Sequence, residues 1–393
     1  VGCGWWGMNN LRYLMRTGQA EITALCDVDR NHLEAAANEV QAFQKERPRT
    51  FHDYRDMLRG RDLDIVLIAT PDHWHALTAI AAIEAGADLY LEKPIAHTFL
   101  EGRAILNAAR KHKRVVQVGT HRRSAPYYKS AIEFIREGNL GDIGMVRAFV
   151  YYNIRDQFVP NEKPPEGFDY DFWTGPAPMR PFNRLRYHRT WRQFLDYANG
   201  QLGDWGIHWL DIMRWAMNVK YPKRISSTGG KFVNRGVNTA PDTQVVTYDY
   251  GDFTVVWEHR AWGLSDAPRS PVGVTFYGSK GTLMLTWLDG WTFYPRGRGR
   301  KVIHVDVHYN NRDNENIREH MDNFLECVRT RQRPAADIEE AHYSTALCLL
   351  GMVSLKLGRS ILWDAQRERV VADEEANSLL RREYRKPWVY PEV

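Results

Sequence analysis

Lys93 is the first side chain in the sequence whose position suggests acid-base chemistry. It lies between Glu92 and Pro94, directly after the strand-like run 89–91. A lysine that is partly desolvated beside another positive charge has a lowered pKa, which suits proton exchange with a hydroxyl group. A simple pairing with Glu92 at the edge of a sheet explains the same position equally well.

A second group of polar side chains lies in the otherwise apolar segment 203–215. Asp204, His208, Asp211 and Trp215 follow one another at steps of four, three and four, which places them along one stripe of a helix. Burying two carboxylates and an imidazole costs several kcal/mol unless partners or function compensate. An imidazole oriented by a nearby acid is a good general base near neutral pH. A structural His-Asp cluster is one alternative, and a metal site shared by an acid and a histidine one turn apart is another.

The chain begins with a glycine pattern typical of phosphate binding. Gly2, Gly4 and Gly7 match the spacing G-x-G-x-x-G, and Trp5 and Trp6 complete the turn. In a strand-turn-helix unit the first glycine permits a tight turn, the second lets the backbone approach a pyrophosphate, and the third allows close packing of helix and strand. The spacing alone also fits an ordinary glycine turn.

Asp27 strengthens the interpretation of that turn as a dinucleotide site. It ends the strand-like run 21–27 and follows Gly7 by twenty residues. At this distance a carboxylate reaches the ribose hydroxyls of adenosine. Asp27 would repel a 2′-phosphate, so the sequence predicts NAD rather than NADP.

Alternating helix and strand patterns extend from Gly2 to about Gly119 and predict a doubly wound domain with a parallel sheet. Helices are expected over 31–45, 73–85 and 100–111, and strands over 64–69, 89–91 and 115–118. Ligands bind off the carboxyl ends of such strands. The residues at these ends and at the start of the second helix are therefore candidates for ligand contact. Those assigned to the cofactor are Asp27, Thr70, Pro71, His75, Glu92 and Lys93, and Thr120 occupies the corresponding position after the last strand.

The rest of the chain predicts a second domain built on a large, mostly antiparallel β-sheet. Strand-like runs occur at 145–152, 244–250, 254–258, 272–277 and 283–287. The segment 160–200 is rich in Pro, Arg, Tyr and Trp, and we expect it to form a wall of the site. We place the NAD-binding domain at 1–124 and the second domain at 125–393, with the final helices and arm, 313–393, packing back on the first domain.

Composition bounds the ligand classes and the compartment. With 53 Lys and Arg against 48 Asp and Glu over 393 residues, nucleic acid and acidic membranes are poor candidate partners. Fourteen Trp and nineteen Tyr suggest pockets for ring-shaped ligands such as sugars. The four cysteines lack metal-binding spacing and predict buried, reduced thiols, so no metal site is assigned. Only Val1 precedes the glycine turn. We therefore expect a preceding strand to be missing, favour a cytoplasmic location and leave periplasmic export open.

Taken together, the motifs resemble those of the glucose-fructose oxidoreductase, inositol dehydrogenase and rhizopine-catabolism group, the Gfo/Idh/MocA family. The resemblance rests on the following residues: the glycine turn, Asp27, Ala69-Thr70-Pro71 with His75, Glu92-Lys93-Pro94, Gln117 to Thr120 with Arg122 and Arg123, and Gly203-Asp204 through His208 to Asp211. It implies a Rossmann domain followed by a domain whose open sheet makes homodimer or homotetramer contacts. It also implies that Lys93, Asp204 and His208 form the catalytic group.

The expected activity is NAD-dependent transfer of hydride between the cofactor and a secondary hydroxyl of a sugar, polyol or glycoside. His208 or Lys93 would take the hydroxyl proton, and Asp204 would orient that base. Further substrate contacts are expected where polar and aromatic groups converge opposite the cofactor, namely Arg123, Tyr151, His188, Trp191 and Arg192. One alternative is an NAD-dependent glycosidase or lyase that oxidises its substrate transiently, with no net redox change. Another is a sensor that binds sugar or nucleotide without turnover.

Overall fold

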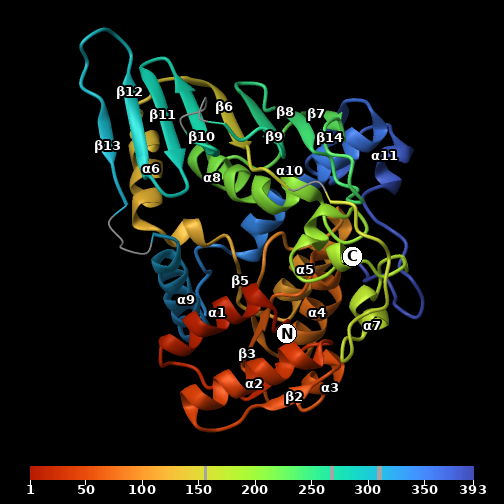
Figure 1. Cartoon of the computed structure of the whole chain (residues 1–393). Helices are drawn as coiled ribbons and strands as arrows, with labels where there is room; N and C mark the ends of the chain where they lie inside the picture. Colours follow the sequence, from red (N-terminus) through yellow and green to blue (C-terminus); the bar gives the residue numbers. More distant parts are fainter. Residues whose placement is uncertain (155–156, 266–269, 308–311) are drawn as a thin grey trace.

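The computed structural model describes residues 1–154, 157–265, 270–307 and 312–393. Figure 1 shows an α/β region, coloured red to orange, on one side of a large twisted sheet. Helices that pack against the sheet lie between these two parts. This is the predicted fold class, a Rossmann-like parallel sheet joined to a large, mostly antiparallel one.

The α/β region contains five short parallel strands and five helices. The strands are β1 (Ala24–Cys26), β2 (Arg49–Phe51), β3 (Ile65–Ile68), β4 (Asp88–Leu91) and β5 (Val116–Val118). The helices are α1 (Trp5–Arg16), α2 (Arg30–Gln44), α3 (Tyr54–Leu58), α4 (Asp72–Ala85) and α5 (Phe99–Lys111). Val1 and Gly2 connect the pair β1-β2 to the trio β3-β4-β5, because Gly2 N donates to Cys26 O (2.9 Å) and Ala69 N donates to Val1 O (2.9 Å). The glycine turn therefore lies between the two sets of strands.

The second sheet has ten strands in the order β13-β12-β11-β10-β6-β9-β8-β7-β14-β15. Every neighbouring pair is antiparallel except β6 and β9, which are parallel. The strand bounds are β6 Ile143–Val150, β7 Arg224–Gly230, β8 Thr243–Asp249, β9 Thr254–Arg260, β10 Val272–Gly278, β11 Gly281–Thr286, β12 Trp291–Pro295, β13 Ile303–Val305, β14 Ile361–Asp364 and β15 Arg369–Val370. Helices α6 (Pro126–Arg136), α8 (Ile207–Met217) and α10 (Ile338–Leu357) cover one face and share a large apolar core with it.

The last part of the chain contacts both regions. Helix α9 (Arg312–Thr330) packs against α1, and α10 packs against α5 as well as against β7. After the short helix α11 (Glu374–Ser378) the closing arm returns to the α/β region. There Trp388 packs edge-on against Trp74 of α4, with ring centroids 4.7 Å apart, and Arg382 pairs with Glu101 of α5 at 2.9 Å. These contacts join the end of the chain to the cofactor-binding half.

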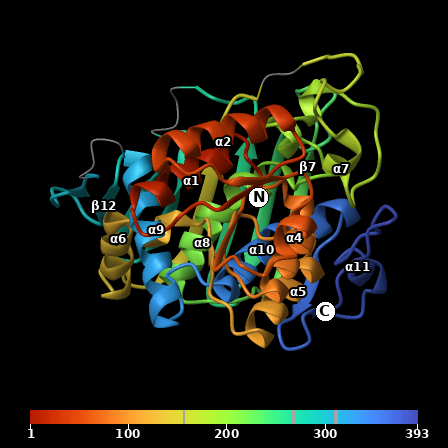
Figure 2. The same cartoon turned by 90° about the horizontal axis from the view of Figure 1, so that it is seen from below.

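The aromatic segment 160–200 contains only short elements, α7 (Tyr170–Thr174), η2 (Arg184–Arg186) and η3 (Thr190–Gln193). Its rings form a small core of their own. Backbone hydrogen bonds tie it to the start of α2: Arg30 N donates to Gly167 O (2.9 Å) and Asp169 N donates to Val28 O (3.0 Å). In Figure 2 this segment lies at the α2 side of the α/β region.

No helix in the described part of the chain combines the length and the apolar character needed to cross a bilayer. All four cysteines are buried and free, as the sequence predicts.

Candidate functional site

A deep pocket lies between the α/β region and the aromatic segment. Its floor is the glycine turn with Gly2, Gly4 and Gly7, and its opposite wall is formed by residues 187–192. Asp27, Thr70 and Pro71 line it at the carboxyl ends of β1 and β3. Two segments that are far apart in sequence, within residues 1–78 and 168–192, therefore enclose one cavity.

The three glycines have the steric roles that a dinucleotide turn requires. Gly2 has φ 86°, and a Cβ atom there would lie 2.8 Å from Ala69 O. A Cβ atom on Gly7 would lie 1.9 Å from Gly2 O, so helix and turn could not approach so closely. Gly4 faces open space, with no atom within 4 Å of its Cβ position. That space is where a pyrophosphate can approach the backbone at the start of α1.

Asp27 is held in position by the turn itself. Its Oδ2 accepts from Cys3 N (2.6 Å) and its Oδ1 from Asp29 N (2.8 Å). Burial raises the pKa of this carboxyl group, and the two backbone donors oppose the rise. The side chain lines the pocket. The glycine turn and this anchored carboxylate fit the pyrophosphate and adenosine ribose of NAD.

Two predicted cofactor residues lie behind the pocket wall. The ring nitrogens of His75 lie 2.9 Å from Thr70 O and 2.8 Å from Pro94 O, and burial lowers its pKa to about 4. Glu92 accepts from Asn10 Nδ2 (2.7 Å) on α1, and burial raises its pKa. Neither side chain lines the pocket. Their contacts hold the loops after β3 and β4 in place.

Lys93 and Asp204 meet across the two regions. Lys93 Nζ lies 2.8 Å from both the backbone O and the Oδ1 of Asp204. Asp204 lies on a π-helical turn, Leu202–Gly206, directly before α8. Turns of this wide type often occur at functional sites. Arg192 Nε approaches the same Oδ1 at 3.2 Å. Burial alone would raise the pKa of Asp204, but Lys93 and Arg192 lower it, so the group is ionised.

His208 follows on the first turn of α8 inside an aromatic enclosure. Its ring centroid lies 5.2 Å from that of Trp287, 5.8 Å from that of His121 and 6.1 Å from that of Trp205. Burial lowers its pKa well below the ordinary value, and the charges of Lys93 and Arg122 lower it further. Nδ1 has no hydrogen-bond partner among the described residues. His208 is therefore a neutral imidazole with an unused polar atom, within the electrostatic reach of Lys93.

Sequence reasoning missed the enclosure around His208. His121 follows β5 in the run Gly119-Thr120-His121, so the rule that ligands bind at strand ends could have identified it. Trp205 lies within the segment 203–215, but its position beside His208 was not predicted. Trp287 follows β11 in the second sheet, and no local pattern relates it to His208.

Only one of the five additional substrate candidates reaches the Lys93-Asp204 pair, and that residue is Arg192. His188 lies at the other end of the pocket, where its Nε2 is 3.7 Å from Asp29 Oδ2. Trp191 borders the pocket but is 5% exposed and packs in the aromatic core. Tyr151 directly follows β6, binds Arg147 and Glu258 and does not line the pocket. Its role as a substrate contact stays a prediction.

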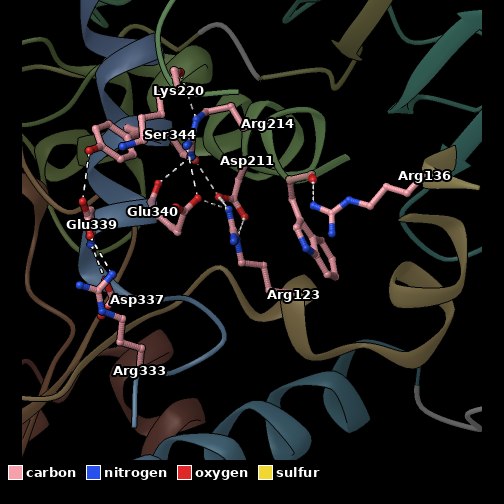
Figure 3. A network of polar contacts seen from close by, with 12 residues as sticks. Arg123, Arg136, Asp211, Arg214, Lys220, Arg333, Asp337, Glu339, Glu340 and Ser344 are labelled. Carbon is pink, nitrogen blue, oxygen red and sulfur yellow. Dashed lines mark hydrogen bonds and ion pairs between the residues drawn. The ribbon is translucent and has the colours of Figure 1, made fainter. Parts of the chain in front are cut away.

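Arg123 is also placed differently from the expectation. Its guanidinium forms two hydrogen bonds with Asp211, at 2.7 and 2.8 Å, and both side chains are almost fully buried. Figure 3 shows the surrounding network. Ser344 Oγ donates to Asp211 Oδ1 (2.7 Å), and Arg214 donates to Ser344 Oγ and to Glu340 O, both at 2.8 Å. This network joins α8 to α10 and does not line the pocket.

Comparison with known proteins identifies the family. Residues 1–120 match the oxidoreductase family with an NAD-binding Rossmann fold, and residues 142–256 and 305–390 match the C-terminal alpha/beta domain of the same family. The chain belongs to the Gfo/Idh/MocA oxidoreductase family. NAD is therefore the cofactor for which the glycine turn and Asp27 are built, as the sequence predicts.

Individual relatives extend this similarity. The chain is 32% identical to inositol 2-dehydrogenase of Salmonella paratyphi B over 168 residues, which is 42% of this chain and 48% of that protein, or about half its length. It is 37% identical to glycosyl hydrolase family 109 protein 2 of Shewanella sp. strain ANA-3 over 26% of this chain and 23% of that one. The fold resembles that of the WlbA dehydrogenase from Bordetella pertussis, solved with NADH and UDP-GlcNAcA. That match has a TM-score of 0.70 and 20% identity and covers 92% of this chain and 97% of that one.

Proposed function

We propose that this protein is an NAD-dependent oxidoreductase acting on a secondary hydroxyl of a sugar, polyol or glycoside. The proposal rests on the Lys93–Asp204 pair and on neutral His208, one helical turn further along. None of the three side chains lines the pocket itself, but Arg192 lines it and its Nε lies 3.2 Å from Asp204 Oδ1, which connects the group to the dinucleotide site. Inositol 2-dehydrogenase, a relative over part of the chain, is named for a polyol. The WlbA structure contains a sugar nucleotide beside NADH.

The side chains have distinct roles in this reaction. Bound NAD supplies the hydride acceptor. Neutral His208 takes the proton of the substrate hydroxyl, because its unpaired Nδ1 can accept a hydrogen bond. Asp204 pairs with Lys93 and so favours the ammonium form, which stabilises negative charge developing on the substrate oxygen. Asp204 thus orients Lys93 directly.

The direct test is turnover by the purified protein with NAD and a panel of sugars, polyols and glycosides. We expect NADH to accumulate with at least one of them, and Lys93→Ala and His208→Ala to lose that activity while they still bind NAD. If both variants stay within a few fold of the parent, the assigned roles are wrong. NAD binding without hydride exchange on any member of the panel would favour a sensor.

A second candidate function uses the same residues for redox-neutral cleavage of a glycoside. Two observations favour it, the partial match to a glycosyl hydrolase and the enclosure of His208 by Trp205, Trp287 and His121. In this reaction transient oxidation acidifies a neighbouring C–H bond, a substituent is eliminated, and the resulting ketone is reduced again. Nitrophenyl glycosides separate the two reactions. Release of nitrophenol without matching NADH supports cleavage, whereas NADH in step with consumed glycoside supports simple oxidation.

We also propose self-association through the outer face of the ten-stranded sheet. Met145 of β6 and Tyr277 of β10 are paired there and exposed, and Arg147 covers the buried Phe149 ring. Sedimentation of the purified protein should give a dimer or tetramer. Charge reversal at Arg147 should shift the distribution towards monomers.

A further inference from the structure

Residues 187–192 of the aromatic segment run along the whole length of the cofactor pocket. Tyr187 hydroxyl donates to Asp29 at the start of α2, and the next residue, His188, packs on His32 with ring centroids 4.0 Å apart. Arg189 covers the Trp5 ring at the glycine turn, and Arg192 ends the run beside Asp204. One short stretch thus passes from the adenosine end, over the phosphate turn, to the catalytic centre.

Arg189 is the residue of this stretch that lies at the phosphate turn. Its guanidinium carbon is 4.0 Å from the centroid of the exposed Trp5 ring. Within the described ranges no carboxylate lies within ion-pair distance of it. Arg189 is solvent-exposed, so its charge is available to an incoming anion.

The glycine turn itself supplies little positive charge for a pyrophosphate. Helix α1 begins at Trp5, and its backbone N–H groups offer only the partial charge of a helix start. Its two arginines do not serve the turn: Arg12 pairs with Glu39 at 2.6 Å and Arg16 is in the last helical turn. Any side-chain cation that adds to this partial charge therefore comes from outside the first helix.

We infer that Arg189 binds the pyrophosphate of the cofactor, and that residues 187–192 form the outer wall of the dinucleotide site. A guanidinium presents paired N–H donors that match phosphate oxygens. The stacking on Trp5 holds it beside the open space over Gly4. A segment outside the α/β region thereby contributes a direct contact to a ligand whose floor belongs entirely to that region. This inference uses bound NAD but does not depend on which reaction follows.

A metal ion is a less suitable occupant for the nearby group Asp29, His32 and His188. Their ligand atoms lie within 4.8 Å of one another. However, Asp29 Oδ1 caps α2 by accepting from Asn31 N (2.9 Å), and its Oδ2 accepts from the Tyr187 hydroxyl. Both oxygens are thus already engaged, which favours a contact that fixes the wall at the adenosine end.

The test compares binding of NAD, ADP-ribose and adenosine to the full chain by calorimetry. Arg189→Ala should weaken NAD and ADP-ribose by roughly 10- to 100-fold, the loss of a charge-assisted hydrogen bond to phosphate, and leave adenosine unchanged. Arg189→Lys should recover part of the loss. Arg184→Ala is the matched control, because Arg184 is an exposed arginine of the same segment and does not line the pocket.

The possible outcomes are distinct. If Arg189→Ala binds NAD and ADP-ribose as Arg184→Ala does, or loses affinity for adenosine equally, the assignment is overturned. The same conclusion follows if the parent binds adenosine as tightly as NAD. Binding requires no turnover, so a parent that oxidises no sugar but loses NAD affinity on Arg189→Ala would contradict the proposed function and support this inference.

Discussion

Two acid-base pairs on neighbouring turns of one helical stretch serve different purposes. Asp204 pairs with Lys93 and Asp211 with Arg123, and in both pairs the aspartate meets a cation from the first 124 residues. The Lys93 and Asp204 side chains are 11% and 20% exposed, whereas those of Arg123 and Asp211 are 6% and 1% exposed. The more exposed pair is linked to the pocket through Arg192, and the buried pair holds helices together.

The difference lies in how many polar atoms are left unused. Asp211 accepts on both oxygens, from Arg123 twice and from Ser344. Asp204 Oδ1 accepts from Lys93 Nζ and lies 3.2 Å from Arg192 Nε. Among the described residues no hydrogen bond reaches its Oδ2. A pair whose hydrogen-bonding capacity is exhausted can only stabilise structure. A pair with spare capacity can bind a substrate hydroxyl.

Lys93→Ala should have the largest effect of the substitutions, and that effect should be on activity. It removes the cation at the substrate oxygen, so we expect kcat to fall by about 10²- to 10⁴-fold. The free energy of unfolding should fall less than on loss of the Arg123–Asp211 pair, because the Lys93–Asp204 pair is the more exposed of the two. Steady-state turnover and denaturant unfolding of the same preparation measure both quantities. A variant that unfolds but keeps specific activity per folded molecule would reverse the two assignments.

Asp211→Ala should have the complementary effect. Removing one partner of a buried pair leaves Arg123 uncompensated, at a cost of about 3–5 kcal/mol in the free energy of unfolding. Urea unfolding followed by circular dichroism measures the change. Asp204→Ala is the matched control and should lose activity with much less loss of stability. Equal destabilisation by the two substitutions would contradict the distinction.

The pH dependence of turnover sharpens the role of His208. Burial lowers its pKa well below the ordinary value of about 6.5, so the imidazole remains an available base throughout the neutral range. The acid side of the kcat profile should therefore begin below pH of about 6.5. The neutral form of His208 also contributes to the free energy of unfolding. This contribution is complete above the pKa of the unfolded state and is lost as the pH falls towards the lower pKa of the folded state. His208→Gln should abolish the acid limb and reduce the drop in thermal midpoint on acidification. If the acid limb of the kcat profile lies at or above neutral pH, a residue other than His208 is the base.

The sequence predicted the alternation of helices and strands well because each element has a strong local signal. The helix expected over 73–85 is Asp72–Ala85, and the strand expected over 283–287 is Gly281–Thr286. Strands β2, β7, β12, β14 and β15 were missed. β7 carries two glycines and three hydroxyl residues, and its neighbours in the sheet and helix α10 stabilise it.

The site was predictable only to the level of candidate residues. Period-3.6 spacing identified Asp204, His208 and Asp211 as one polar stripe, but the stripe cannot say which carboxylate meets a lysine in a pocket. The π-helical turn at Leu202–Gly206 has no spacing signature, and it helps to set the direction of Asp204. Tyr151 was chosen for its residue type, and nothing in the sequence around it indicates that its partners are Arg147 and Glu258.

Asp27 tests whether a buried carboxylate can still act on a ligand. It is held by two backbone donors, as a structural acid would be, yet it lines the pocket. Asp27→Asn keeps one acceptor and removes the charge, so NAD affinity should fall about tenfold while the discrimination against NADP decreases. Dissociation constants for both cofactors measure this change. Asp29→Asn is the comparison, because Asp29 caps α2 and binds Tyr187, so it should weaken the two cofactors equally. A shift in cofactor preference from Asp29→Asn, and none from Asp27→Asn, would move the ribose contact two residues along the chain.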